Sequence, residues 1–368
     1  MTPDPGLASW LQLTLTPGLG ASVIRKLLRQ FGLPQSVIAR KHELAAFAAP
    51  AALQALHSEA VQAAVEAALR WAAEPGHFVI TLADELYPRA LLEIADPPSL
   101  LYAHGRIELL QRSCLAIVGS RNATAQGESN AERFARALSD AGLTVVSGLA
   151  VGIDAAAHRG GLAGAASTIA VLGTGVDVLY PKRNLDLAAQ IAARGLLLSE
   201  FPLGTGPVAS NFPRRNRLIS GLAQGCLLVE AALASGSLIT ARAAADQGRE
   251  VFAIPGSIHS PLSKGCHALI KSGAKLVESA EDVLAELSGF RPSGYASTTA
   301  RAASAAAPRS SGLLEHMGHD PMDVDSLCAS AGMSAEQVAS ELLRLELEGR
   351  IAALPGGLYQ RLEKDNQG

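Results

Sequence analysis

Apolar residues recur at three- and four-residue intervals through the first fifth of the chain, from residue 7 to about residue 73. This spacing predicts amphipathic helices, and the breaks at Pro17-Gly18 and Gly32-Leu-Pro34 predict turns between them. We therefore expect a small all-helical domain over residues 1–75.

A short motif within this domain, Thr16-Pro-Gly-Leu-Gly20, precedes a helical stretch and has the form of a hairpin between two helices. Hairpins of this kind are typical of SAM-like and helix-hairpin-helix domains, and their free backbone amides can hold a phosphate. The simpler interpretation is that the glycines let two helices turn and pack. The shortness of the motif favours this simpler interpretation.

From residue 78 onward the pattern changes to short β-branched runs that alternate with helical stretches. That alternation indicates βαβ units and predicts an α/β fold, a parallel sheet with helices on both faces. With right-handed crossovers it becomes a Rossmann-like doubly wound, mainly parallel sheet over residues 78–288, with ligand sites outside the carboxyl ends of the strands. The expected strands are 114–119, 144–147, 168–172, 196–200, 226–229, 250–254 and a short one near 275–277. The expected helices are 125–141, 153–163, 184–194, 214–223, 238–247 and 280–287.

The segment 289–312 lacks periodicity and is rich in small polar residues, which predicts a flexible linker. Beyond it, helical stretches at 323–330 and 335–348 and a β-hairpin over 351–362 outline a winged-helix domain over residues 313–364. The second helix has a single basic residue against four glutamates, Glu336, Glu341, Glu346 and Glu348. Because a winged helix normally presents a basic helix to duplex DNA, we do not expect that role here. A protein contact, a regulatory role and a structural remnant all remain open.

The composition of the 368 residues, 48% hydrophobic and 18% charged, excludes global disorder and is typical of a globular protein with a large aliphatic core. The net charge of −3 does not attract a polyanion to the whole molecule, so any nucleic-acid site must depend on local clustering. Such a cluster exists, because residues 205–275 hold eight basic and three acidic side chains. The four cysteines are far apart and no run approaches 18 apolar residues, so we expect a cytoplasmic location, no structural zinc and no membrane span.

Small and phosphate-friendly residues follow the predicted strands, at the edge where the carboxyl ends of a parallel sheet meet. Gly119-Ser-Arg121 ends the first strand, and glycine-rich turns that begin at Ser147 and Gly173 end the next two. Glycines permit close backbone approach, and hydroxyls and helix amino termini donate hydrogen bonds. Arg121 and Lys182 add positive charge. This edge of the sheet is therefore predicted to bind phosphate.

Two further segments repeat this chemistry, Asn211-Phe-Pro-Arg-Arg-Asn-Arg217 and Ser235-Gly-Ser-Leu-Ile-Thr240. One phosphate needs only one such turn, so five of them predict several phosphates in a row, as in a polynucleotide backbone. Turn geometry and helix capping explain part of the glycines and hydroxyls. They do not explain three arginines within four residues.

The sequence lacks the usual cofactor and catalytic motifs. Gly119-Ser-Arg-Asn-Ala-Thr has an arginine where a G-x-G-x-x-G fingerprint needs its second glycine, and no P-loop or H-E-x-x-H motif occurs. Asp154 and His158 are one helical turn apart and would suit acid–base chemistry, but a carboxylate at a helix start beside its i+4 neighbour is more often structural. We therefore expect no catalytic residue, no cofactor and no metal.

The combination of these motifs closely resembles the DNA-processing protein A family (DprA, also called Smf). It also includes Asp96-Pro-Pro98, Ser199-Glu-Phe-Pro202 and Ala253-Ile-Pro-Gly256, and it covers about residues 78–288. The resemblance implies a non-enzymatic single-stranded-DNA binder that forms homodimers and loads the RecA recombinase onto incoming DNA in natural transformation. The predicted helical and winged-helix domains match domains that often flank that core.

Motif matching with the family also implies roles for individual residues. The family's dimer contacts lie near the closing segment, which makes Leu269 and Ile270 candidate interface residues. Where the family usually has Gly-x-Asn this chain has Gly265-Cys-His267, so no role is carried over to His267. Together with the turns above, the residues expected to contact DNA are Gly119, Ser120, Arg121, Gly148, Lys182, Asn211, Arg214, Arg215, Asn216, Arg217, Ser235, Ser237 and Thr240.

The alternative is a nucleotide-processing enzyme of the related lysine-decarboxylase-like (LOG) Rossmann group, which cleaves nucleoside monophosphates. That group has a Pro-Gly-Gly-x-Gly-Thr motif before a helix with a catalytic glutamate. Here Ser235-Gly-Ser-Leu-Ile-Thr240 stands in the corresponding place, and Pro355-Gly-Gly357 lies in the predicted tail hairpin. The sequence therefore favours the DNA-binding mediator.

Overall fold

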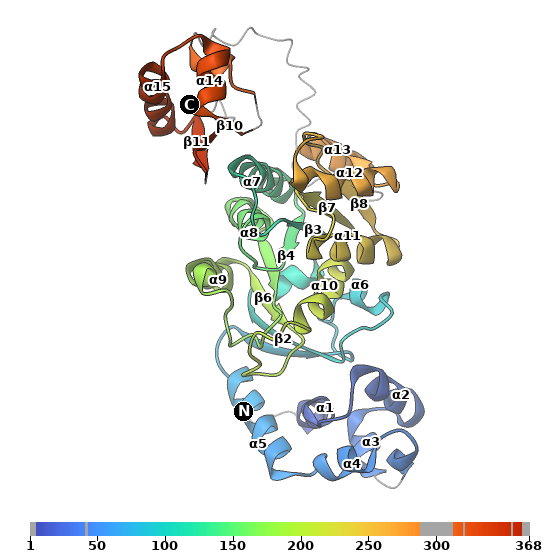
Figure 1. Cartoon of the computed structure of the whole chain (residues 1–368). Helices are drawn as coiled ribbons and strands as arrows, with labels where there is room; N and C mark the ends of the chain where they lie inside the picture. Colours follow the sequence, from blue (N-terminus) through green and yellow to red (C-terminus); the bar gives the residue numbers. More distant parts are fainter. Residues whose placement is uncertain (1–4, 41–42, 288–311, 319–320, 355, 363–368) are drawn as a thin grey trace.

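The computed structural model describes residues 5–40, 43–287, 312–318, 321–354 and 356–362. An N-terminal group of helices, a central sheet with its helices and a C-terminal winged helix follow one another along the molecule (Figure 1). The predicted linker over 289–312 falls, except for Gly312, outside the described residues.

The N-terminal part is built from amphipathic helices whose apolar faces meet in a core of their own around Leu13, Ile24 and Leu56. It is also joined to the central sheet, because Trp10 and Ala68 belong to the same buried cluster as Tyr102. Its α-helices in the described residues are α1 (Pro5–Leu15), α2 (Ala21–Phe31), α3 (Pro34–Ala39), α4 (Pro50–Ala55) and α5 (Glu59–Ala72).

A sheet with the strand order β1-β2-β6-β5-β4-β3-β7-β8-β9 forms the centre of the molecule. The strands from β6 to β9 in this order run parallel, and β2 is antiparallel to both of its neighbours. The predicted Rossmann-like, doubly wound and mainly parallel α/β fold is confirmed. The strands are β1 (His77–Thr81), β2 (Leu100–Gly105), β3 (Cys114–Gly119), β4 (Thr144–Ser147), β5 (Thr168–Val171), β6 (Leu196–Ser199), β7 (Gly225–Val229), β8 (Glu250–Ala253) and β9 (Lys275–Leu276).

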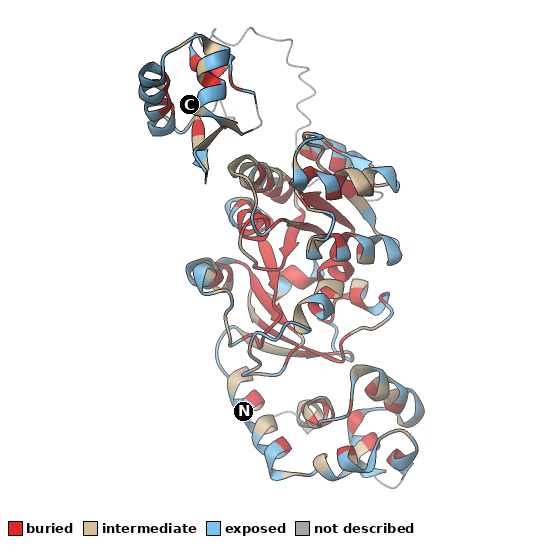
Figure 2. Ribbon diagram, viewed as in Figure 1, coloured by how far each residue is buried: buried red, intermediate tan, exposed pale blue. Residues whose placement is uncertain are grey.

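Helices cover both faces of this sheet and leave its strands buried (Figure 2). Burial on two faces explains why the strands are continuously apolar rather than alternating. One layer of helices packs on the sheet through residues such as Leu218 and Leu238. Its helices are α6 (Arg89–Leu92), α10 (Asn211–Leu222), α11 (Gly236–Asp246) and α12 (Lys264–Lys271). The other packs through residues such as Leu138 and Ile191 and consists of α7 (Ala125–Asp140), α8 (Ile153–Ala163), α9 (Leu185–Arg194) and α13 (Ala280–Glu286).

Several elements differ from the sequence-based prediction. The antiparallel strands β1 and β2 at one end of the sheet were not predicted, because no crossover helix of the βαβ pattern marks them. The short helices α6 and α12 were not predicted either. Helix α10 begins at Asn211 rather than at residue 214. Pro213 lies in the first turn of α10, where backbone N–H groups have no partner within the helix. Proline lacks this N–H, so the helix loses no hydrogen bond there and continues through Pro213.

The C-terminal part is the predicted winged helix, and its helices pack around Leu327, Val338 and Leu342. It contacts α7 of the central part, where the backbone N–H of Gln126 donates a hydrogen bond to Oε1 of Gln360 (3.4 Å). Its elements are α14 (Val324–Ala331), α15 (Ala335–Leu347), β10 (Met322–Asp323), β11 (Ile351–Leu354) and β12 (Leu358–Arg361), with the strands in the order β10-β12-β11.

The end of β3 provides a test of how closely this fold is packed. A Cβ on Gly119 would lie 1.9 Å from the carbonyl oxygen of Val229 and 2.6 Å from Cγ1 of Ile153. We expect Gly119→Ala to lower the free energy of unfolding of the central part by about 3 kcal/mol, because neither the strand nor the helix behind it has room to move. Thermal unfolding measures this change.

Gly236→Ala is the matched control, because a Cβ at Gly236 meets no atom within 4 Å. We expect the thermal midpoint of this control to stay unchanged or to rise slightly, since alanine is the better helix former. Equal destabilisation by both substitutions would contradict the argument from close packing.

Candidate nucleic-acid interface

The order of the strands reverses between the neighbours β3 and β7. From β3 the chain continues to β4, β5 and β6 on one side, whereas β8 and β9 follow β7 on the other. The helices that leave these two strands, α7 and α11, pack on opposite faces of the sheet. Doubly wound folds bind ligands at such a reversal, and a pocket of about 310 Å³ lies there.

Four segments that are far apart in the sequence line this pocket, which we call the switch-point pocket. They are the turn after β3, the turn after β4 with the start of α8, the first three turns of α10, and the loop after β7 with the start of α11. The fold therefore brings together much of the predicted DNA-contacting set. The predicted residues that line the pocket are Gly119, Ser120, Arg121, Arg215, Asn216, Ser235, Ser237 and Thr240.

The backbone at this rim approaches itself too closely for side chains. Gly152, at the start of α8, has φ +78°, and a Cβ there would lie 2.4 Å from the carbonyl oxygen of Ser120. The N–H of Ile153 donates to that same oxygen (3.1 Å). The glycine thus fixes the turn that presents Ser120 and Arg121 to the pocket.

Two of the predicted cations, Arg121 and Lys182, are exposed. In the part of the chain that the structure describes, neither forms an ion pair with an acidic side chain. Arg121 lines the switch-point pocket, whereas Lys182 lies outside it, in the turn that leads to α9. Both side chains are available to a phosphate.

Arg215 differs from the prediction that it is open to phosphate. The residue is 4% exposed, and its Nη1 donates to the carbonyl oxygens of Gly148 (2.7 Å) and Val171. Burial lowers the pKa of Arg215 to about 10, with Asp154 raising it and Arg121 lowering it. Arg215 is therefore a buried cation beneath the pocket, and the sequence-based assignment of a surface contact is corrected for this residue.

Arg217 is also bonded within the protein, so its predicted contact with DNA is corrected too. Its Nη2 donates to Oε2 of Glu200 (2.5 Å), its Nη1 donates to the carbonyl oxygen of Asp96, and its side chain is 16% exposed. Arg214 shares the same carboxylate oxygen (3.1 Å) but remains 51% exposed. Burial raises the pKa of Glu200, while Arg217 and Arg214 lower it. Of this arginine group, Arg214 alone keeps a large exposed surface.

Most of the remaining predicted residues cap helices or hydrogen bond to their neighbours around the pocket. Oγ of Ser235 accepts from the N–H of Ser237 (3.2 Å) as the cap of α11, and Thr240 is buried one turn further on. Asn216 accepts from Nε of Arg215 (3.2 Å). Five predicted residues do not line the switch-point pocket: Gly148, Lys182, Asn211, Arg214 and Arg217.

Asp154 and His158 do not hydrogen bond to each other but hold the turn after β4. Asp154 accepts from the N–H of Gly148 (3.1 Å), and Nε2 of His158 accepts from the N–H of Leu149 (3.2 Å). Because Nε2 accepts, Nδ1 carries the proton and donates to Oγ1 of Thr168 (2.7 Å). Burial lowers the pKa of His158 to about 3, with a smaller contribution from Arg215, and burial raises the pKa of Asp154. The structural interpretation of this pair accounts for all these contacts.

Several residues that line the pocket are absent from the predicted DNA-contacting set, and two of them, Asn122 and Phe212, have side chains suited to contact DNA. Phe212 also packs against Tyr180, with the ring centroids 5.8 Å apart. The available signal was the helical spacing of Phe212 with Arg215 and Asn216, which places all three on one face of α10.

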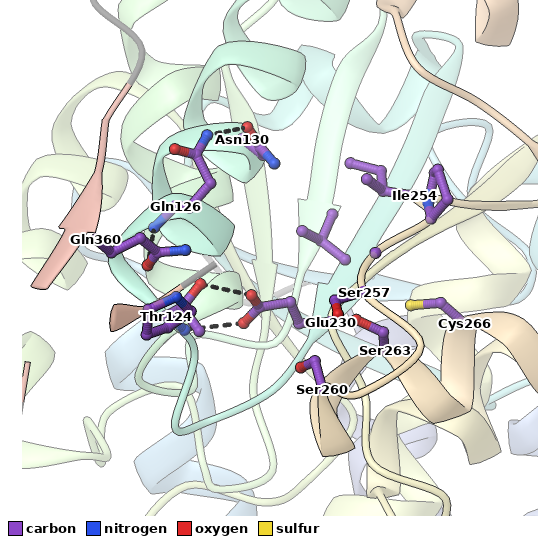
Figure 3. A pocket seen from close by; sticks show the side chains of 14 residues that line it. Thr124, Gln126, Asn130, Glu230, Ile254, Ser257, Ser260, Ser263, Cys266 and Gln360 are labelled. Atoms are coloured by element: carbon purple, nitrogen blue, oxygen red, sulfur yellow. Dashed lines mark hydrogen bonds between the residues drawn. The ribbon is translucent and has the colours of Figure 1, made fainter. Parts of the chain in front are cut away.

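A second pocket, of about 320 Å³, lies beside the amino terminus of α7 (Figure 3). There the carboxylate of Glu230 accepts from the N–H of Thr124 (2.8 Å) and from its hydroxyl (2.6 Å). An amino terminus that already holds a carboxylate does not favour a further anion. The second pocket is therefore the poorer candidate for a phosphate site.

The candidate dimer residues lie on α12, near the edge strand β9. Leu269 is buried in the core of the central part, and Ile270 is half-buried against the same cluster. Nε2 of His267 lies 3.0 Å from the carbonyl oxygen of Gly256, so this side chain supports the turn after β8. Leu269 is only 8% exposed and offers a partner little surface, whereas Ile270 offers more.

Among the described residues, no group of three or more histidine, cysteine, aspartate or glutamate side chains is arranged to hold a metal ion. No described helix is long and apolar enough to cross a membrane.

The fold and the pocket together define a class of protein. It is a Rossmann-like protein whose switch-point pocket has basic and hydroxyl groups in place of a dinucleotide fingerprint, and which has a winged helix at its C-terminal end. The family model described as DNA recombination-mediator protein A matches residues 78–288, and that of the DprA winged helix domain matches residues 297–357. The chain belongs to the DNA recombination-mediator protein A family.

Individual relatives agree with this assignment. Protein Smf of Escherichia coli is 44% identical over 308 residues, which are 82% of this chain and 81% of the relative. DNA processing protein DprA of Streptococcus pneumoniae is 50% identical over 206 residues, 56% of this chain and 73% of the relative. Membership of this family decides in favour of the DNA-processing recombination mediator over the LOG-like enzyme.

Solved structures agree as well. The X-ray structure of DprA from Streptococcus pneumoniae is similar with a TM-score of 0.64 and 39% identity, and the match covers 77% of this chain and 97% of that one. The structure of DNA processing protein A from Helicobacter pylori has a TM-score of 0.51 and 30% identity over 56% of this chain and 94% of that one. It is described as giving insights into a single-stranded-DNA binding mode.

The buried histidine predicts a specific dependence of stability on pH. His158 has a pKa of about 3 in the folded chain against 6.5 for an ordinary histidine, so only the unfolded chain takes up this proton between these values. Its contribution to stability is therefore complete above pH 6.5 and is lost as the pH falls toward 3. We expect His158→Gln to make the loss of stability below pH 6.5 shallower, by up to about 1.4 kcal/mol per pH unit.

The measurement is the thermal or urea midpoint of each variant at several values between pH 7 and pH 4. His259→Gln, at an exposed histidine, is the control and should keep the pH dependence of the parent chain. A His158→Gln curve that is parallel to the parent curve would show that the buried ring does not stay neutral.

Proposed function

We propose that this recombination mediator binds single-stranded DNA with the sugar–phosphate backbone across the carboxyl rim of its central sheet. The observation that carries the proposal is the switch-point pocket, where residues from four distant segments meet around an exposed arginine. The single-stranded-DNA binding described for the similar protein of Helicobacter pylori supports it.

Direct phosphate contacts are proposed for the exposed cations Arg121, Lys182 and Arg214. Ser120 and Asn216 add hydrogen-bonding groups at the pocket, and the amides at the start of α11 add the positive end of a helix dipole. Arg215 contributes as a fixed positive charge below the pocket rather than as a contact. The other predicted residues shape the turns that hold these groups.

A flexible strand fits this arrangement better than a duplex. The three cations follow different strands, Arg121 after β3, Lys182 after β5 and Arg214 after β6. A single strand can bend to reach them without breaking base pairs. The winged helix supplies no basic reading surface, because α15 has a single basic residue, Arg344, which is paired with Glu341 and Glu348. We therefore propose a preference for single strands.

No covalent step is part of the proposal. Asp154 and His158, which have the residue types of an acid–base pair, are engaged with the backbone of the turn after β4. The protein acts by holding DNA and handing it on. By its resemblance to the family, it hands the strand to the RecA recombinase in the cytoplasm; growth of RecA filaments on DNA with and without the protein tests this step.

The proposed organisation keeps the predicted divisions, a helical domain over 1–75, a DNA-binding domain over 78–288, a linker over 289–312 and a winged helix over 313–364. For the homodimer we propose contacts around Ile270 and the edge strand β9, where Leu276 is 49% exposed. An open edge strand with an apolar side chain is a natural pairing surface. Sedimentation of Leu276→Arg against the exposed control Leu33→Arg tests it, since a dimer with both variants would contradict this interface.

The contact at Arg121 gives the central test of the proposed function. We expect Arg121→Ala to weaken binding to single-stranded oligonucleotides by about tenfold, and to reduce the slope of log K against log salt by about 0.7, because one phosphate contact is lost. Since the backbone carries no sequence information, the loss should be similar for every oligonucleotide. Fluorescence anisotropy over a salt series measures both quantities.

Arg112→Ala is the matched control, because Arg112 is exposed just before the amino end of β3, whereas Arg121 lies beyond its carboxyl end. The two substitutions change the net charge equally, but they lie at opposite edges of the sheet. Equal losses from both, or a loss from Arg121→Ala that is confined to one sequence, would overturn backbone binding at the rim.

A further inference from the structure

An acidic residue is buried at the rim that is proposed to bind a polyanion. Glu200 follows β6 directly, and its side chain is 2% exposed. One of its oxygens, Oε2, accepts from both Arg214 and Arg217. A carboxylate at this place repels DNA, so its position beneath two arginines calls for a physical reason.

Further ion pairs extend from Glu200 to the N-terminal helices. Arg217 bonds to Asp96, and Asp96 in turn accepts from Nη2 of Arg25 on α2 (2.6 Å). We call these residues the rim network: Arg25, Asp96, Glu200, Arg214 and Arg217. Its three cations and two anions leave one positive charge, and the most exposed of the cations is Arg214.

The contacts of Arg214 hold its guanidinium in one place without covering it. Glu200 accepts from one nitrogen, Nη2, and the ring of Phe201 lies 5.3 Å from Cζ. The side chain remains half exposed, so other N–H donors of the guanidinium stay available. A free arginine loses rotamer entropy when it binds a phosphate, and an arginine that is already held in place loses less.

We propose that Glu200 is a positioning residue for DNA binding, which fixes the guanidinium of Arg214 at the rim and thereby increases the affinity for single-stranded DNA. This inference rests on the proposed function, because it needs Arg214 to contact a phosphate. Arg217 supplies the second cation that balances Glu200, and Asp96 and Arg25 hold Arg217.

The direction in which DNA affinity changes when Glu200 is replaced distinguishes a positioning role from a simple effect of charge. Removing a negative charge near a bound polyanion strengthens binding when charge alone matters. If Glu200 acts by fixing Arg214, its removal weakens binding although the protein becomes more positive. The two explanations therefore predict opposite changes for the same variant.

The experiment compares Glu200→Gln, Arg214→Ala and the double variant of the full chain in salt-titrated anisotropy with a single-stranded oligonucleotide. We expect Glu200→Gln to weaken binding about fivefold and to reduce the salt slope by up to about 0.7, as the loss of one phosphate contact does. In the Arg214→Ala background it should cause no further loss, because its effect passes through Arg214.

Two companion variants guard against a merely structural effect. Glu200→Asp keeps the carboxylate and should restore part of both the affinity and the salt slope, which general destabilisation would not do. Asp186→Asn removes an exposed carboxylate on α9, outside the rim network, and should leave binding unchanged or strengthen it. Circular dichroism confirms that each variant is folded.

Unchanged or tighter binding by Glu200→Gln would overturn the inference, as would losses that multiply in the double variant. If Arg214→Ala alone leaves affinity and salt slope unchanged, the contact at Arg214 fails and the inference fails with it. Arg121→Ala tests the rim independently of this network, so the proposed function can fail or stand separately.

Discussion

A buried guanidinium, that of Arg215, ties the turn after β4 to the end of β5 beneath the switch-point pocket. It donates to the carbonyl oxygens of Gly148 and Val171, and Asp154 lies close enough to raise its pKa. Burying a charge is costly unless hydrogen bonds replace water, and here the strand ends supply them. Arginine suits the position because it remains charged even with a pKa lowered to about 10. The pocket thus has a permanent positive charge below it.

The two helix amino termini at the strand reversal have different roles, and this difference selects the face for an anion. The carboxylate of Glu230 already occupies the start of α7, and it is held there by two hydrogen bonds from Thr124. The start of α11 has no acidic residue in its first turn and faces the switch-point pocket. Both termini are positive ends of helix dipoles, but only the first holds a carboxylate directly. The acidic side chain that lines the switch-point pocket, Asp154, comes from α8 and accepts from the N–H of Gly148. The sheet is therefore chemically asymmetric although its two helical layers are similar.

The sequence predicts the strands of the parallel core to within a residue or two, because strands that are buried on both faces are continuously apolar. It does not reveal β1 and β2, whose antiparallel pairing lacks a crossover helix. It also places Arg214, Arg215 and Arg217 together as one basic cluster, whereas successive helix positions point in directions about 100° apart. Arg215 accordingly turns toward Gly148, and Arg214 and Arg217 turn toward Glu200. Composition reports how many charges a segment has but not which of them are buried. The same limit applies to the apolar residue Leu269, because a leucine in the sequence can belong either to the core or to an interface.

The engagement of two arginines inside the protein limits how strongly the rim can hold a polyanion. Each phosphate contact releases counterions and adds affinity, so a rim with five open cations would bind more tightly than one with three. The internal arginines instead fix the geometry of the remaining contacts, which lowers the entropy lost on binding. Affinity that comes from a few ordered contacts is easier to reverse than affinity from many mobile charges, since loss of one contact removes a large share of it. A protein with the proposed role of passing its strand to a recombinase needs such reversibility. The buried arginines of the rim and the proposed role of a mediator are thus consistent with one another.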